Sequence, residues 1–300
     1  MSAAIFGQVL TAMVTPFLPD GSIDRDGVER VVNHLLANGS DGIVVCGTTG
    51  ESPTLSHDEK LELFELVKSA VAGRGAVVAG TGGNDTQASI QLTREANELG
   101  VDGALLVVPP YNKPSQEGLY RHFRAIAEAA PNLKCVLYNV PTRTAQNMDA
   151  ATTVRLAHDV PNIVAMKEAS GNLTQCAEIV SNAPTGFNLY SGDDALTLPM
   201  LAIGGVGVVS VSAHLVGKEM KAMHTSFFSG DREAAVRLNC KMLPIVKACF
   251  QSTTPSPAPV KAGMNLLGVN VGGLRLPLVE ANEREVEIVR SALFAYGLLG

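Results

Sequence analysis

One recurring pattern restricts the fold of this chain more than any other feature of its sequence. A short, mostly apolar run is followed by a cluster of Gly, Pro, Thr or Asn and then by an amphipathic helical stretch. Apolar runs without polar alternation are typical of parallel strands whose two faces are covered by helices. Eight strands are predicted, beginning roughly 20 to 35 residues apart: Val9–Val14, Gly42–Cys46, Ala76–Gly80, Ala104–Val108, Cys135–Asn139, Ile163–Lys167, Asn188–Ser191 and Gly207–Val211.

Eight strand–helix units predict an α/β fold, a TIM (β/α)₈ barrel over residues 1–225. The alternative is a doubly wound open sheet, in which a G-x-G-x-x-G turn is expected after the first strand. That turn instead reads Thr15-Pro16-Phe17-Leu18-Pro19-Asp20-Gly21. Residues 226–300 form a predicted C-terminal helical appendage, with helices at Glu233–Phe250, Pro257–Leu267 and Glu280–Tyr296.

Local signals mark the ends of the predicted helices. Gly39 follows an apolar stripe that begins at Val28, as expected for a left-handed residue just past a helix. Ser56-His57-Asp58-Glu59 has the spacing of a capping box. Ala195–Gly217 lacks Asp, Glu, Lys and Arg, but Pro199 and its glycines break it into a short helix and a strand. We therefore expect no membrane partner.

Charge and cysteine content exclude several kinds of function. The 23 basic and 29 acidic residues give a net charge of −6, which leaves no basic face for nucleic acid. The five cysteines are widely spaced and form no C-x-x-C motif, which indicates neither a disulfide framework nor a zinc site. We expect five buried thiols in a reducing cytoplasm.

In such a barrel the chemistry lies at the carboxyl ends of the strands, where one lysine stands out. Lys167 closes the sixth apolar strand, and a lysine walled by core side chains is desolvated, which favours a neutral amine able to attack a carbonyl. The alternative is an ordinary charge paired with a neighbour such as Glu168.

Three further strand ends carry candidate groups. Gly47-Thr48-Thr49-Gly50-Glu51 follows the second strand and could form a tight turn for a small carboxylate, although Gly-Thr turns are common at strand ends. At the end of the fifth strand, Tyr138 could transfer protons and Arg143 could bind a second carboxylate. The alternative is that Tyr138 is a core residue and Arg143 an ordinary surface residue. Tyr111 lies in a proline-flanked loop after the fourth strand. It is a site residue, an ordinary exposed aromatic residue or a contact between subunits.

Taken in order along the chain, these motifs resemble the dihydrodipicolinate synthase family, within the N-acetylneuraminate lyase superfamily of pyruvate-dependent class I aldolases. The resemblance covers essentially the whole chain. It rests on the turn after the second strand together with Tyr138-Asn139-Val140-Pro141-x-Arg143-Thr144, Met166-Lys167-Glu168-Ala169-Ser170-Gly171-Asn172 and Ser191-Gly192-Asp193-Asp194.

The resemblance implies a Schiff-base condensation of pyruvate with L-aspartate-4-semialdehyde on the route to diaminopimelate and lysine, without a metal or organic cofactor. Lys167 would form the imine and Thr48 and Thr49 would hold the pyruvate carboxylate. Thr49, Tyr138 and a Tyr111 from a neighbouring subunit would relay protons, within a homotetramer built from tight dimers. The remaining implied substrate-binding residues are Arg143, for the aldehyde's carboxylate, and Gly192 and Val209, for pyruvate.

Two other functions stay open. One is a sister aldolase acting on a sugar-derived 2-keto acid, although Arg143 and the Thr48-Thr49 pair differ from the pattern of N-acetylneuraminate lyases. The other is a non-catalytic metabolite-binding barrel. That function would require one of the expected catalytic residues to be missing, and all of them are present in the sequence.

The resemblance also implies a degenerate allosteric site for lysine. The family's inhibitory cleft corresponds here to Ser52, Pro53, His57, Lys60, Asn84, Ala88 and Pro110. Sensitive enzymes commonly carry an aromatic residue or His in place of Lys60, Glu in place of Ala88 and Tyr in place of Pro110. Loss of a carboxylate and gain of a like charge predict weak or absent lysine inhibition.

Overall fold

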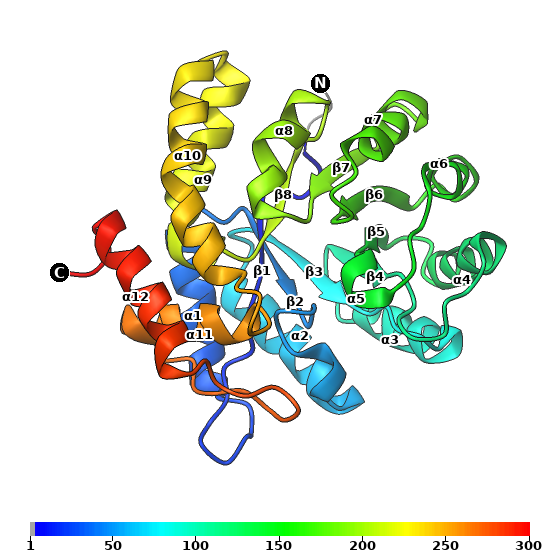
Figure 1. The fold of residues 1–300 in the computed structure, drawn as a ribbon. Coiled ribbons are helices and arrows are strands. Elements are labelled where there is room, and N and C mark those ends of the chain that lie inside the picture. The colour runs from blue at the N-terminus through cyan, green and yellow to red at the C-terminus, as the bar shows by residue number, and fades with distance from the viewer. Residues whose placement is uncertain (1–3) are drawn as a thin grey trace. The chain divides into compact units, whose positions relative to one another are not determined.

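The computed structural model describes residues 4–300, and their strands follow one another around a closed parallel barrel in sequence order (Figure 1). The predicted barrel is therefore confirmed, and every predicted strand is present. The boundaries differ by at most two residues, as at β1, where Met13 still donates a backbone hydrogen bond to Val44 beyond the end of the strand. The strands are β1 Val9–Ala12, β2 Gly42–Val45, β3 Ala76–Gly80, β4 Gly103–Val107, β5 Lys134–Asn139, β6 Ile163–Glu168, β7 Asn188–Ser191 and β8 Gly207–Ser210.

Helices separate the strands and then continue to the end of the chain. Short 3₁₀ helices also occur at Ser52–Thr54 and Asp194–Leu196. The α-helices are α1 Arg25–Ala37, α2 His57–Val71, α3 Thr86–Glu98, α4 Gln116–Glu128, α5 Pro141–Thr144, α6 Ala150–Asp159, α7 Leu173–Asn182, α8 Thr197–Ala202, α9 Ala213–Ser229, α10 Arg232–Cys249, α11 Pro257–Leu266 and α12 Glu283–Tyr296.

The local signals read from the sequence appear in these helices. Ser56 and Glu59 form the predicted capping box at α2: the Ser56 hydroxyl accepts from the Glu59 backbone N–H, and the Glu59 carboxylate accepts from that of Ser56. Gly39 follows α1 with a φ of +93°, a left-handed conformation that glycine adopts without a steric penalty. The uncharged run contains α8 and β8, as predicted, and no helix within residues 4–300 is long and apolar enough to cross a membrane.

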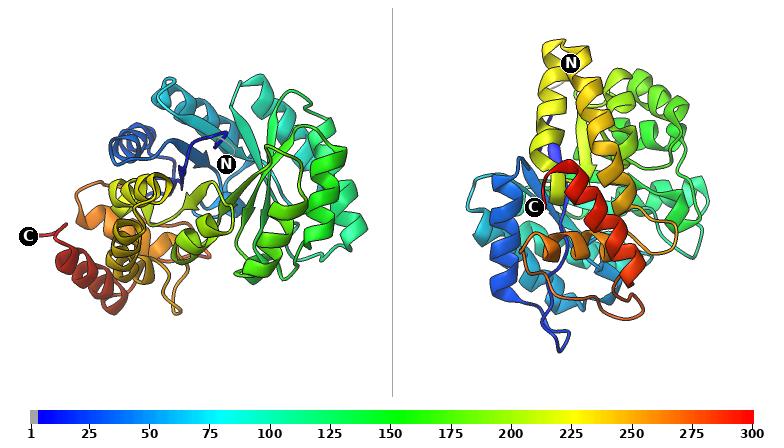
Figure 2. Two further views of the ribbon diagram at one scale, coloured as in Figure 1. Left: turned by 90° about the horizontal axis from the view of Figure 1, so that it is seen from above. Right: turned by 60° about the vertical axis from the view of Figure 1, so that its left-hand side comes forward.

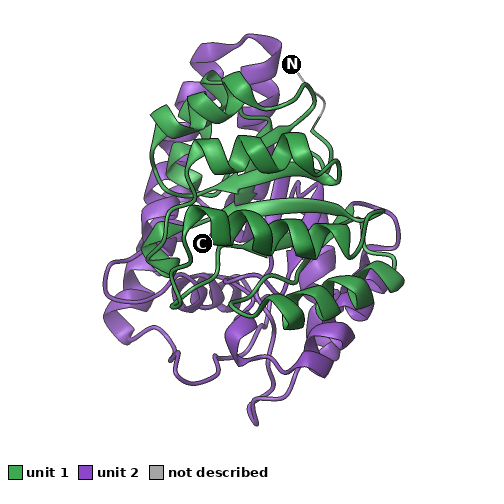
Figure 3. Ribbon diagram, turned by 90° about the vertical axis from the view of Figure 1, so that its right-hand side faces the viewer, with its two compact units in different colours: residues 1–8, 76–209 green, residues 9–75, 210–300 purple. Residues whose placement is uncertain are grey.

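The described chain divides into two compact units, shown in Figure 3. Unit 1 comprises residues 1–8 and 76–209, and unit 2 comprises residues 9–75 and 210–300. Unit 1 contains β3 to β7, whose strands pair in parallel, and most of their residues are buried. In unit 2, β1 pairs with β2, and α12 packs on α10 and α11 (Figure 2). The expected border at residue 225 falls inside α9.

One sequence expectation about the thiols is wrong. Cys46, Cys135, Cys176 and Cys249 are buried, but Cys240 is exposed. It lies on α10 one turn after the exposed Val236, on the helix face opposite the buried Met242. Helical periodicity, which places residues four apart on one face, therefore turns Cys240 to solvent.

Candidate active site

Lys167 is the second-last residue of β6, near the carboxyl end of the strand, and only 5% of its surface is exposed. It is a register partner of Tyr138 on β5, and register partners on parallel strands project from the same face of a sheet. The Lys167 amine nitrogen lies 4.2 Å from the centre of the Tyr138 ring. An aromatic face at this distance stabilises a cationic nitrogen, whether ammonium or iminium.

Glu168 belongs to a different set of contacts from Lys167. Consecutive residues of a strand point to opposite faces, and the buried Glu168 carboxylate accepts hydrogen bonds from the Asn139 amide (3.1 Å), the Gln175 amide (2.9 Å) and the Ser170 backbone N–H (2.6 Å). These neutral donors satisfy the carboxylate. The alternative in which Glu168 neutralises Lys167 is therefore not favoured by the structure.

Gly192 follows β7 and lies beside the stem of Lys167. Its backbone N–H donates to the Glu168 carbonyl (2.7 Å), which holds it against β6. A Cβ atom at position 192 would lie 3.1 Å from Lys167 Cγ and 2.7 Å from the Ala169 side chain. The absence of a side chain at Gly192 thus leaves space for the lysine. Val209 is also buried, and continuing the register of β7 and β8 by one residue places it level with Gly192.

Arg143 is presented by a short helix immediately after β5. Pro141 begins α5, and the helix ends at Ala145, which has a φ of +55°. The Thr144 hydroxyl donates to the carbonyls of Val140 (3.2 Å) and Gln146 (2.9 Å), which fixes this turn. Arg143 itself is exposed.

Tyr111 lies in the loop that follows β4, and its side chain is 91% exposed. Its backbone has a φ of +75°, a region that residues with a side chain seldom occupy. The next residue anchors the loop, since the Asn112 amide donates to the Asn84 carbonyl (2.9 Å). The loop therefore holds an unburied aromatic ring away from its own chain.

The turn Gly47-Thr48-Thr49-Gly50-Glu51 lies in unit 2. Two successive backbone hydrogen bonds form it, from Gly50 to Gly47 and from Glu51 to Thr48, both 3.1 Å long. The Thr15 hydroxyl donates to the Gly50 carbonyl (2.7 Å), and Thr49 is buried. A Cβ at Gly50 would lie 3.0 Å from the Met13 carbonyl oxygen, so a side chain there would push the turn away from β1.

Two residues outside the predicted motifs, Lys261 and Arg275, also hold this turn. Lys261 on α11 donates to the Glu51 carboxylate (2.6 Å), and the Arg275 backbone N–H donates to its other oxygen (3.0 Å). Burial lowers the pKa of Lys261 from its ordinary value, and the Glu51 carboxylate opposes that change. One sequence signal was available, because Lys261 is the only charged residue in the predicted helix Pro257–Leu267.

The predicted site residues are divided between the two units. In unit 1, Lys167, Tyr138 and Gly192 meet at the carboxyl ends of adjacent strands, and Arg143 and Tyr111 lie on the loops that follow β5 and β4. Thr48 and Thr49 belong to unit 2. The candidate lysine-site positions also fall in both units: Asn84, Ala88 and Pro110 in unit 1, and Ser52, Pro53, His57 and Lys60 in unit 2.

Known proteins share this sequence and fold over nearly their whole length. Residues 5–295 match the model of the dihydrodipicolinate synthetase family. The 4-hydroxy-tetrahydrodipicolinate synthase of Moorella thermoacetica is 55% identical, over 98% of this chain and 99% of its own. The 4-hydroxy-tetrahydrodipicolinate synthase of Cyanothece sp. is 53% identical, over 98% of this chain and 99% of its own.

Solved structures agree with this assignment. Dihydrodipicolinate synthase from Cyanidioschyzon merolae, determined with lysine bound, is 50% identical, with a TM-score of 0.96 over 98% of this chain and 99% of its own. A monomeric dihydrodipicolinate synthase variant is 41% identical, with a TM-score of 0.95 over 98% of both chains. The protein is therefore a member of the dihydrodipicolinate synthetase family.

Proposed function

We propose that this enzyme condenses pyruvate with L-aspartate-4-semialdehyde to give 4-hydroxy-tetrahydrodipicolinate. The observation that carries the proposal is the buried Lys167 beside the Tyr138 ring, at the end of a barrel strand. The names of the curated relatives support the choice of reaction, and the identity extends over nearly the full length of each.

The proposed reaction begins at the Lys167 nitrogen. Its neutral amine attacks the keto carbon of pyruvate, water leaves, and a protonated imine forms. That imine accepts electron density as the pyruvate methyl group loses a proton, which gives an enamine. The enamine carbon then bonds to the aldehyde carbon of the second substrate, whose oxygen takes up a proton. Attack of the substrate's own amino group on the imine carbon closes the ring and releases Lys167.

Each of the remaining site residues has a proposed task. Thr48 and Thr49 hold the pyruvate carboxylate with their hydroxyls and backbone N–H groups. Gly192 and Val209 line the pyruvate site, and Arg143 binds the carboxylate of the aldehyde substrate through its planar pair of donors. Thr49, Tyr138 and Tyr111 carry protons between the reacting groups.

Tyr111 would act from a neighbouring subunit of a homotetramer built from tight dimers. Its 91% exposure supports this assignment, because a ring so far from its own chain's core is available to a partner. Mixing subunits tests it. Tyr111→Phe and Lys167→Ala proteins, each inactive or weak alone, should regain activity when co-refolded, since the Lys167→Ala subunit donates an intact Tyr111. Failure to complement, with native mass spectrometry showing mixed tetramers, would place Tyr111 in its own chain's site.

The imine itself can be trapped. Borohydride reduction with pyruvate, followed by peptide mass mapping, should place a pyruvyl adduct on Lys167, and Lys167→Arg should give none. An active wild-type protein that is not labelled would refute the mechanism. Turnover with aspartate semialdehyde, compared with sugar-derived aldehydes, then separates this synthase from a sister aldolase, and binding of pyruvate without turnover would indicate a metabolite-binding barrel.

We further propose that the enzyme works in the cytoplasm. The odd number and wide spacing of its cysteines support a reducing compartment.

A further inference from the structure

We propose that Lys261 and Glu51 are positioning residues, which set the turn that holds the pyruvate carboxylate. Neither is proposed to touch substrate. The inference rests on the proposed function, because it concerns how Thr48 and Thr49 are presented to pyruvate.

Glu51 ends the turn in a conformation that needs an external anchor. Its φ is +58°, a left-handed conformation that is costly for a residue with a side chain. Its carboxylate is buried, and the hydrogen bond from Glu51 N–H to the Thr48 carbonyl links this residue directly to the threonine pair. A change in the direction of Glu51 therefore changes the direction of Thr48.

Lys261 on α11 supplies that anchor, although it lies 210 residues after Glu51 in the sequence. Its nitrogen donates to Glu51 and to the Gly273 carbonyl, both at 2.6 Å, and its side chain is only 1% exposed. The same nitrogen lies 4.4 Å from the centre of the Phe17 ring, in the loop that follows β1. One ammonium group therefore fixes the turn after β2 against α11 and the residue 273 segment.

Arg275 reinforces the same arrangement from its guanidinium group. It donates to the Thr54 carbonyl (2.9 Å) and the Gly21 carbonyl (2.8 Å), and it pairs with Glu59 on α2. Its charge lies 4.5 Å from the centre of the Phe17 ring. The segment around Arg275 therefore holds the residues on both sides of the turn. The turn is fixed by this whole set of contacts, and not by the Lys261–Glu51 pair alone.

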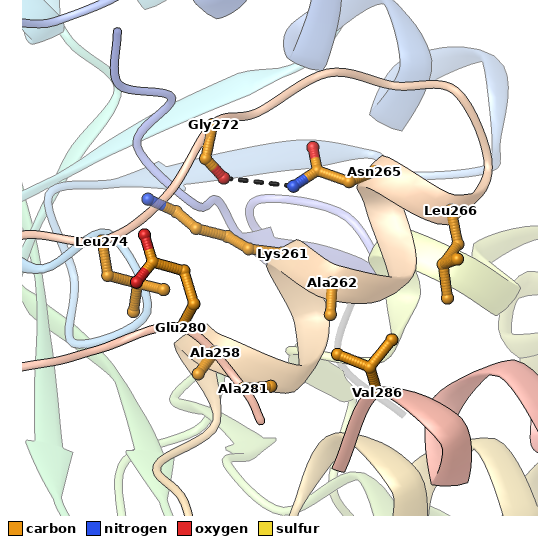
Figure 4. A pocket seen from close by; sticks show the side chains of 10 residues that line it. All are labelled: Ala258, Lys261, Ala262, Asn265, Leu266, Gly272, Leu274, Glu280, Ala281 and Val286. Carbon is orange, nitrogen blue, oxygen red and sulfur yellow. Dashed lines mark hydrogen bonds between the residues drawn. The ribbon is translucent and has the colours of Figure 1, made fainter. Parts of the chain in front are cut away.

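A cavity of about 330 Å³ beside Lys261 allows a direct experiment. It is lined mainly by apolar side chains of α11 and of the segment after it, with the stem of Lys261 and the carboxylate of Glu280 in its wall (Figure 4). If Lys261 is shortened to alanine, the lost propylammonium portion leaves a gap next to this cavity. A small amine entering the cavity can then take the place of the missing ammonium group.

The test compares Lys261→Ala with the wild type at a temperature where circular dichroism shows both fully folded. We expect the KM for pyruvate to rise about tenfold, since small displacements of substrate-holding groups have large kinetic effects. The KM for aspartate semialdehyde should stay unchanged. Propylammonium should restore the KM for pyruvate saturably, whereas tetramethylammonium, which has no N–H donor, should not.

Lys221→Met is the matched control. Lys221 pairs with Asp41 at 2.6 Å in the same unit, where Asp41 also accepts from the backbone N–H of Val9, the first residue of β1. Loss of this pair should lower thermal stability and leave both KM values unchanged. If Lys261→Ala behaves like Lys221→Met, the positioning role is overturned and Lys261 is purely structural.

Glu51→Gln keeps the inference testable if Lys261→Ala does not fold. The glutamine retains the size of Glu51 and can still accept from the Arg275 backbone N–H, so we expect a folded protein with about a threefold rise in the KM for pyruvate. An unchanged KM would contradict the inference. Imine trapping at Lys167 in the wild type is the independent check on the proposed function, which can stand even if this inference fails.

Discussion

The amine nitrogen of Lys167 lies 4.2 Å from the centre of the Tyr138 ring, and the two residues are register partners on neighbouring parallel strands. The strand pairing therefore fixes their distance, because neither residue is on a flexible loop. An aromatic face favours a cationic nitrogen, whereas burial favours a neutral one. In the proposed mechanism, the protonated imine would suit this environment better than a free ammonium ion, because its positive charge is spread over a larger and less hydrated group.

Tyr138→Phe separates the ring from the hydroxyl group. The ring would keep its packing against Lys167, so we expect unchanged thermal unfolding and a normal yield of borohydride-trapped pyruvyl enzyme. Turnover should fall by about 10²- to 10⁴-fold, the usual effect of losing a proton-transfer group. Measuring the steady-state turnover and the yield of trapped pyruvyl enzyme on the same preparation of the variant checks both expectations. Wild-type turnover in the variant would remove Tyr138 from the proton relay.

Gly192→Ala tests the space beside Lys167. The new Cβ would lie 3.1 Å from Lys167 Cγ and 2.7 Å from Ala169 Cβ, so one of these side chains must shift, at a cost of about 1–3 kcal/mol. We expect the rate of imine trapping to fall at least several-fold. Gly83→Ala is the control, because its Cβ would meet only the Ser89 hydroxyl at 3.6 Å. Equal trapping in both variants would contradict the prediction.

Glu168→Gln tests the buried carboxylate next to Lys167 in sequence. The change would turn an acceptor into a donor opposite the Asn139 and Gln175 amides, and it would leave buried donors unsatisfied. We expect a loss of about 2–4 kcal/mol in the free energy of unfolding, measured in urea. A loss below 0.5 kcal/mol would mean that these amides rearrange freely.

Stability should fall as the pH drops from about 6.5 to about 4, partly through His214. Its Nε2 accepts from the Val14 backbone N–H (3.1 Å) and its Nδ1 donates to the Val211 carbonyl (2.6 Å), which defines a neutral ring. Burial lowers the pKa of His214 to about 4. The unfolded chain, with a histidine pKa of about 6.5, then binds a proton that the folded chain excludes.

This difference in proton binding sets the size of the effect. At pH 5, protonation of His214 in the unfolded chain should lower the free energy of unfolding by about 2 kcal/mol relative to its value above pH 6.5. Urea unfolding at a series of pH values measures the slope, and His214→Gln, which keeps a donor and an acceptor, should make it shallower. An identical slope in the variant would mean that His214 titrates alike in both states.

Lysine inhibition is expected to be weak or absent. Lys60 is half-buried, and burial lowers its pKa, so an ammonium group bound beside it would add a second positive charge in a poorly hydrated position. Ala88 provides no carboxylate for an ammonium group. A lysine titration of the initial rate should show half-inhibition only at millimolar concentrations or above. Inhibition well below a millimolar would show that this chain binds lysine through other residues.

The sequence predicted the barrel because continuous apolar runs and helix caps are local signals. The carboxyl ends of those runs also located Lys167 and Tyr138, since a parallel barrel brings strand ends to one rim. The single charge in the predicted helix Pro257–Leu267 marked Lys261 as unusual, but no local signal named Glu51 as its partner, because the two residues are 210 positions apart in sequence. The left-handed backbone of Tyr111 was equally hidden, since conformations of this kind are usually marked by glycine.

The pairing of Glu51 with Lys261 also has a consequence for synthesis of the chain. Glu51 leaves the ribosome long before Lys261, and its carboxylate cannot be buried without a partner at acceptable cost. We therefore expect the turn at residues 47–51 of a nascent chain to gain its Lys261 anchor only after α11 has been translated. Under the proposed function, an unfinished chain should therefore hold the pyruvate carboxylate more weakly than the complete protein, as expected for Lys261→Ala.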